Sequence, residues 1–117
     1  MGVFKKLLDE QLLYEEMSNL RQEDTGLPVI VWVSVKRGKH SARIKVQPSK
    51  SHKIDIDSGI PITISDAPEN IEGYNIPSKT FNKISEWIIL NKTPLLKYWN
   101  MQISTAELLK TLKKLGE

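Results

Sequence analysis

The pattern of apolar residues between positions 29 and 64 restricts the chain to a fold that contains a β-sheet. Residues 29–35 are apolar and β-branched with no glycine or proline, which is typical of a strand buried on both faces. Residues 41–47 then alternate between apolar and polar side chains, as do residues 53–57 and 60–64. Pro61 favours an edge position for the last strand. The pattern predicts a four-stranded antiparallel meander over residues 28–65, with one face in contact with solvent.

A helical pattern precedes this region. Apolar residues at steps of three and four predict an amphipathic helix over about residues 3–22, within an N-terminal helical segment 1–24. Packing of this helix on the sheet is one expectation, and a homo-oligomer built through its apolar stripe is the other. Its polar face is acidic, which argues against contact with an anionic membrane surface.

Further helices are predicted after the sheet. Ser78 is expected to cap the first and Thr93-Pro94 to start the second, while Ser104 and Glu107 form a capping box before the third. Trp87 and Trp99 are expected to fill the core. The sequence therefore predicts one α+β domain (residues 1–117) in which two to three C-terminal helices (residues 78–115) pack on one sheet face.

Composition excludes several classes of protein. Without cysteine the chain has no disulfide, no thiolate zinc site and no cysteine nucleophile, which is compatible with a reducing compartment. Its apolar runs are far shorter than the roughly 20 residues of a membrane-spanning helix. Acidic residues at positions 9, 10, 15 and 16 interrupt any signal-peptide core. We therefore expect a bacterial cytoplasmic protein without a cofactor.

Positive charge is concentrated in residues 28–53, which contain seven basic and no acidic residues, although the whole chain has a net charge of only +3. Such a segment can neutralise the phosphates of nucleic acid. The simpler alternative is a solvated strand face whose charge Asp55 and Asp57 balance. Trp32 is the one aromatic residue in the segment, and its expected burial argues against a surface that stacks single-stranded bases. The candidate nucleic-acid-binding or partner-binding residues are Lys36, Arg37, Lys39, His40, Arg43 and Lys45.

Candidates for catalysis and metal binding are weak. His40 and His52 have the side chain best suited to proton transfer near neutral pH, but neither is followed by a carboxylate that would orient it. Asp55 and Asp57 alternate on one strand, as two ligands of a hard cation would, but an outward-facing polar row has the same spacing. We predict no metal site and retain His40 as a weak catalytic candidate. The loop 69–74 is a further candidate for partner binding.

Several features from about residue 38 onward occur in an order that resembles a known family. They are His40-Ser41, Ile54-Asp55-Ile56 followed by Ser58-Gly59, Ile76-Pro77, Ser85-Glu86-Trp87-Ile88 and Leu95-Leu96-Lys97-Tyr98-Trp99-Asn100. Over roughly residues 38–101 the chain resembles a small bacterial domain-of-unknown-function family, numbered 4160. The resemblance implies a cytoplasmic protein with a protein partner, in the manner of a toxin–antitoxin component. The family's His-x-His-Ala pattern is incomplete, because Gly38 replaces the first histidine and Ser41 the alanine.

The function favoured at this point is a protein-interaction module, as one component of a toxin–antitoxin-like pair, with a protein partner or a second copy of the chain. The alternative is a nucleic-acid-binding or RNA- or DNA-cleaving protein that uses the basic residues 36–53. Cleavage by His40 would require a cleft with a carboxylate or a second histidine within hydrogen-bond reach. An exposed, flat basic face would instead favour binding.

Overall fold

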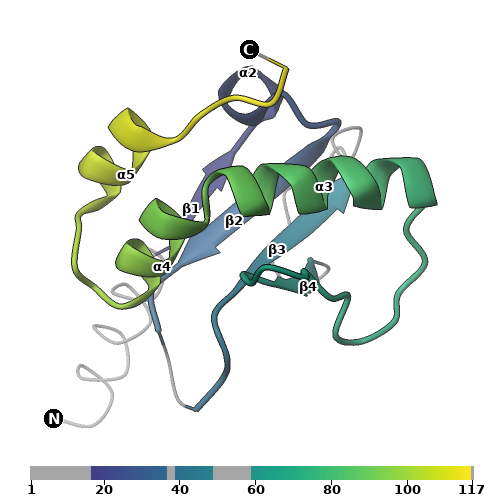
Figure 1. The fold of residues 1–117 in the computed structure, drawn as a ribbon, viewed down its shortest axis with the longest axis horizontal. Helices are drawn as coiled ribbons and strands as arrows, with labels where there is room; N and C mark the ends of the chain where they lie inside the picture. The colour runs from purple at the N-terminus through teal and green to yellow at the C-terminus, as the bar shows by residue number, and fades with distance from the viewer. Residues whose placement is uncertain (1–16, 37–38, 49–58, 117) are drawn as a thin grey trace, which may run out of the picture.

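The chain combines an antiparallel sheet with a layer of helices (Figure 1). The computed structural model describes residues 17–36, 39–48 and 59–116. The strands β1 (Met17–Leu20), β2 (Val29–Ser34), β3 (Arg43–Pro48) and β4 (Ile60–Thr63) form a sheet in the order β1-β2-β3-β4. A short helix α2 (Gln22–Thr25) follows β1, and α3 (Ser78–Leu90), α4 (Lys92–Trp99) and α5 (Thr105–Thr111) cover one face of the sheet. The α+β class predicted from the sequence is confirmed.

The core lies between these helices and one face of the sheet. Val31 on the central strand β2 is fully buried, and Ile44 on β3 pairs directly with the fully buried Ile62 on β4. Trp87 on α3 is also fully buried, and Trp99 at the end of α4 is 6% exposed. The predicted core positions of both tryptophans are therefore confirmed.

The prediction of a helix up to residue 22 is wrong for residues 17–20. These residues form strand β1, which pairs antiparallel with β2 so that Leu20 lies opposite Val31. Ser18 and Asn19 have low helix propensity, and the pairing buries Leu20 to 1% exposure, so tertiary contacts outweigh the helical pattern. The strand expected at residues 53–57 and the helical pattern up to residue 16 lie outside the described residues. Four strands were expected, but the sheet obtains one of them from an unexpected segment.

Strand β4 lies at the edge of the sheet, as Pro61 predicts. Its outer side is nevertheless covered by the loop that follows. The backbone N–H of Thr63 donates to the carbonyl of Glu69 (3.0 Å), and that of Ile71 donates to the carbonyl of Pro61 (3.3 Å). These bonds satisfy backbone groups that an edge strand would otherwise present to other chains.

The helix boundaries agree with prediction at one of three sites. Ser104 accepts a hydrogen bond from the backbone of Glu107, whose side chain reaches back to Ser104, so the predicted capping box is confirmed. Ser78 is the first helical residue rather than the cap, because Pro77 occupies the cap position. Helix α4 already begins at Lys92, one residue before Thr93, because the chain turns directly from α3 into α4 at Asn91.

The C-terminal segment after α5 returns to the start of the sheet region. The backbone N–H of Leu115 donates to the carbonyl of Thr25 (2.8 Å), and the backbone of Lys113 bonds to the side chain of Asn91.

Among the described residues, no helix has the length and apolar character needed to cross a membrane.

Candidate binding face of the sheet

The sheet has a second face, turned away from the helices. Alternation along the strands assigns to it the residues that are out of phase with Val31, Ile44 and Ile62. One end of this face is closed, since Ile30 and Gln47 are 2% and 1% exposed. Pro61 on β4 is buried as well, whereas Asn19, Trp32, Ser34, Arg43 and Lys45 are exposed or half-buried. We call these last five residues the basic patch.

Trp32 lies in the middle of the basic patch, on the central strand. The register places it between Asn19 on β1 and Lys45 on β3. Its indole Nε1 donates a hydrogen bond to Oε1 of Gln47 (2.7 Å), which fixes the ring across β2 and β3. The expected burial of Trp32 is wrong, because the residue is half-buried and shares a face with Arg43 and Lys45. A run of apolar residues shows that a strand is central, but it does not show whether both faces are covered.

Arg43 and Lys45 supply the positive charge of the patch. Both are half-buried residues of β3 and lie on the same side of that strand, as the alternation predicted. The Arg43 guanidinium turns toward Ser41, donating to its carbonyl oxygen (3.1 Å) and to its hydroxyl (3.4 Å). A guanidinium has five N–H donors, so Arg43 keeps donors available for an anion.

The other predicted site residues lie in or beside the turn between β2 and β3. Lys36, Lys39 and His40 are exposed, and Arg37 lies outside the described residues. The backbone N–H of Lys36 donates to the carbonyl of Trp99 (2.7 Å), which attaches the start of this turn to the end of α4. The structure thus places the predicted residues along one strand and its adjoining turn.

His40 does not form a catalytic pair within the described part of the chain. No hydrogen bond joins it to a described carboxylate, and His52, Asp55 and Asp57 lie outside the described ranges. The described residues also contain no cluster of three or more His, Asp or Glu that would hold a metal ion.

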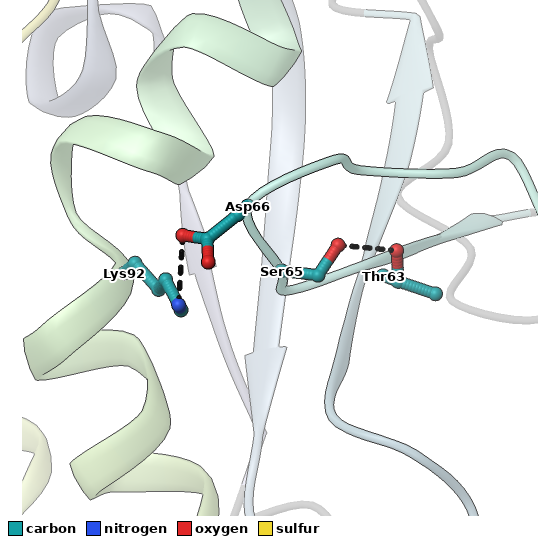
Figure 2. Close-up of polar contacts among 4 residues, drawn as sticks. All are labelled: Thr63, Ser65, Asp66 and Lys92. Atoms are coloured by element: carbon teal, nitrogen blue, oxygen red, sulfur yellow. Dashed lines mark hydrogen bonds and ion pairs between the residues drawn. The ribbon is translucent and has the colours of Figure 1, made fainter.

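Ion pairing among the described residues occurs elsewhere. Figure 2 shows Lys92 at the start of α4 beside Asp66 in the loop after β4, with Nζ and Oδ1 2.8 Å apart. In residues 17–36, 39–48 and 59–116 this is the one ion pair, so no described carboxylate neutralises Arg43 or Lys45. Asp55 and Asp57, which were predicted to balance the positive charge of the strand face, lie outside the described residues.

The loop after β4 is fixed by polar contacts. The hydroxyls of Thr63 and Ser65 lie 3.3 Å apart (Figure 2), and Thr63 also accepts a bond from the backbone N–H of Glu69 (2.9 Å). Further along, a hydrogen bond to Glu72 and the negative charge of that residue raise the pKa of Tyr74 above its usual 10.0. Tyr74 is 54% exposed and Ile71 is 42% exposed, so this loop presents both side chains at the surface. Binding of a partner by the loop stays a prediction from the sequence.

A pocket of about 280 Å³ lies between the sheet and the beginning of α3. Its lining is mostly apolar and includes Val46, Ile60, Ile76 and Ile84, together with the buried Gln47. The described lining contains no titratable side chain, and its one hydroxyl is that of Thr80. The pocket therefore offers no described group for acid–base catalysis.

Comparison of the chain with protein-family models, with curated proteins and with solved structures found no match. The resemblance to the bacterial family of unknown function stays a prediction from the sequence.

Proposed function

We propose that this protein is a non-enzymatic binding module, and that the basic patch on the second sheet face is its surface for an anionic macromolecule. The observation that supports this most directly is the common placement of Arg43 and Lys45 around Trp32 without a described carboxylate beside them. Paired basic residues that stay unneutralised on a rigid sheet attract anions and increase the rate at which they associate.

Binding is favoured over cleavage by the surroundings of His40. General acid–base catalysis requires a second group within hydrogen-bond reach, either on the enzyme or on the substrate. The described residues supply no such group, and Lys36, Lys39 and His40 are exposed in the β2–β3 turn. A protein partner of the toxin–antitoxin type, the cytoplasmic compartment and the single-domain boundary 1–117 remain predictions from the sequence.

Heparin, a sulfated polyanion without bases, tests the proposal. We expect the double variant Arg43→Gln/Lys45→Gln to lose about tenfold or more in affinity at about 50 mM salt, and to show a weaker dependence of affinity on salt than the wild type. The matched control is Lys83→Gln/Lys110→Gln, which removes the same charge from exposed positions on α3 and α5. That control should bind heparin within about twofold of the wild type.

Equal losses in the two double variants would show that net charge alone attracts the polyanion, and would overturn the proposal. No measurable binding by the wild-type protein at the lower salt would overturn it as well. Far-UV circular dichroism of each variant establishes that the fold is retained.

A further inference from the structure

The basic patch contains more than cations, and its other members restrict the kind of anion that fits. Across three neighbouring strands, an exposed amide, a half-buried indole and an ammonium group lie side by side at Asn19, Trp32 and Lys45. Directly opposed residues of an antiparallel pair have Cβ atoms about 5 Å apart, so these three groups can contact one ligand together.

We propose that the ligand of the basic patch is single-stranded nucleic acid, with one base stacked on Trp32. This inference rests on the proposed function, because it names the anion that the same patch binds. The indole is held in place by Gln47 before any ligand arrives, so stacking costs little ordering of the ring. Base stacking on aromatic side chains is the usual means by which sheet surfaces hold unpaired bases.

The spacing of the cations agrees with a nucleic-acid backbone. Arg43 and Lys45 are two residues apart on one strand, which separates their Cα atoms by about 6.7 Å, a distance comparable to that between successive phosphates of an extended strand. The Asn19 amide on the opposite side of Trp32 has both donors and an acceptor, as the edge of a base requires. Phosphate, base face and base edge each meet a suitable group.

Duplexes and acidic polypeptides fit the patch less well. A duplex keeps its bases stacked on one another, and a flat sheet face gives Trp32 no access to them. An acidic polypeptide would satisfy Arg43 and Lys45, but it has no ring to cover the exposed part of the indole. The half-buried Trp32 is therefore the residue that distinguishes single-stranded nucleic acid from the other polyanions.

The test compares three probes on the intact protein: an oligouridylate of about 12 nucleotides, an RNA duplex of the same length and polyglutamate of similar charge. Binding of oligouridylate should quench tryptophan fluorescence, and the quenching should come from Trp32 because Trp87 and Trp99 are 0% and 6% exposed. We expect oligouridylate to bind at least tenfold more tightly than either of the other probes.

Two variants isolate the stacking contribution. Trp32→Leu should weaken oligouridylate binding roughly 5- to 100-fold and weaken heparin binding by a much smaller factor, because heparin has no base to stack on the ring. Trp32→Phe keeps a ring and should retain most of the affinity but lose the quenching. Asn19→Ala, at an exposed position on the edge strand β1, should weaken oligouridylate binding roughly 2- to 10-fold without removing any apolar side chain.

The possible failures are distinguishable. Suppose that heparin binds through Arg43 and Lys45, but that oligouridylate and polyglutamate bind with equal affinity. The nucleic-acid inference is then overturned and the proposed function stands. The same conclusion follows if heparin binds in this way and Trp32→Leu leaves the affinity for oligouridylate unchanged. Tighter binding of the duplex than of the single strand also overturns the nucleic-acid inference. If the wild-type protein binds neither heparin nor oligouridylate, the proposed function itself is overturned.

Discussion

Asn91, at the joint between α3 and α4, makes three side-chain hydrogen bonds from a buried position. The residue is 1% exposed. Its Nδ2 donates to the carbonyls of Trp87 and Lys113 (3.0 Å each), and its Oδ1 accepts from the backbone N–H of Lys113 (2.7 Å). One amide thus joins the end of a helix to a segment 22 residues later. Removing it would leave the backbone of Lys113 without these partners.

We predict that Asn91→Ala lowers the free energy of unfolding by about 2–4 kcal/mol, since it removes three hydrogen bonds made by a side chain that is 1% exposed. Asn100→Ala is the matched control, because the Asn100 Nδ2 also donates to a carbonyl four residues earlier at 3.0 Å but is exposed to water. The control should lose less than about 1 kcal/mol. Urea unfolding followed by circular dichroism measures both, and similar losses would contradict the assigned role of Asn91.

At the residue scale, the sequence predicted the face on which a side chain lies better than it predicted the hydrogen-bond partner of that side chain. It placed Gln47 on the polar side of its strand with Arg43, which the register supports, but gave no sign that Gln47 would be 1% exposed and bonded to Trp32. Such pairings depend on where distant segments meet, and local spacing carries no information about that.

At the scale of elements, the end of α2 shows how closely the C-terminal segment approaches. Gly26 follows α2 with φ of +78°, in the left-handed region that glycine adopts most easily. A Cβ atom there would lie 2.5 Å from the carbonyl oxygen of Leu115, nearer than any real contact. Gly73 has a similar φ of +69° but no atom within 4 Å of its Cβ position. The two glycines therefore differ in packing and not in backbone conformation.

We predict that Gly73→Ala costs about 1 kcal/mol of unfolding free energy, because it introduces only left-handed strain. Gly26→Ala should cost about 3 kcal/mol, because the Leu115 backbone must also move away. Thermal and urea unfolding of the two variants give the difference. Equal costs would mean that the C-terminal segment yields freely and contributes little to the fold.

The elements predicted from the sequence hold where one pattern dominates and fail where patterns compete. The runs at residues 29–35 and 41–47 predicted β2 and β3 to within two residues, because apolar periodicity there has no rival. At residues 17–20 the spacing of Met17 and Leu20 favours a helix, but pairing with β2 decides the outcome. The capping box at Ser104 was predictable because both partners lie within four residues.

The whole molecule separates its stabilising contacts from its candidate binding surface. Helices α3, α4 and α5 lie on one side of the sheet (Figure 1) with the core beneath them, while the strand register places the basic patch on the other side. The sequence indicated a basic segment, but it did not show that Trp32 and Asn19 would join Arg43 and Lys45 on one surface. That assembly requires β1 beside β2, which is the pairing that the helical pattern obscured.

This separation predicts that removing residues 113–117 weakens the fold and leaves binding intact. The deletion removes the bonds to Asn91 and Thr25 and the packing of Leu115, and should cost about 3–5 kcal/mol of unfolding free energy. Deleting only residues 116–117 is the control and should cost less than about 0.5 kcal/mol. Below its melting temperature the shortened protein should bind heparin within about twofold of the wild type. A loss of affinity without unfolding would show that the patch depends on the opposite side of the sheet, and would contradict the separation of the two surfaces.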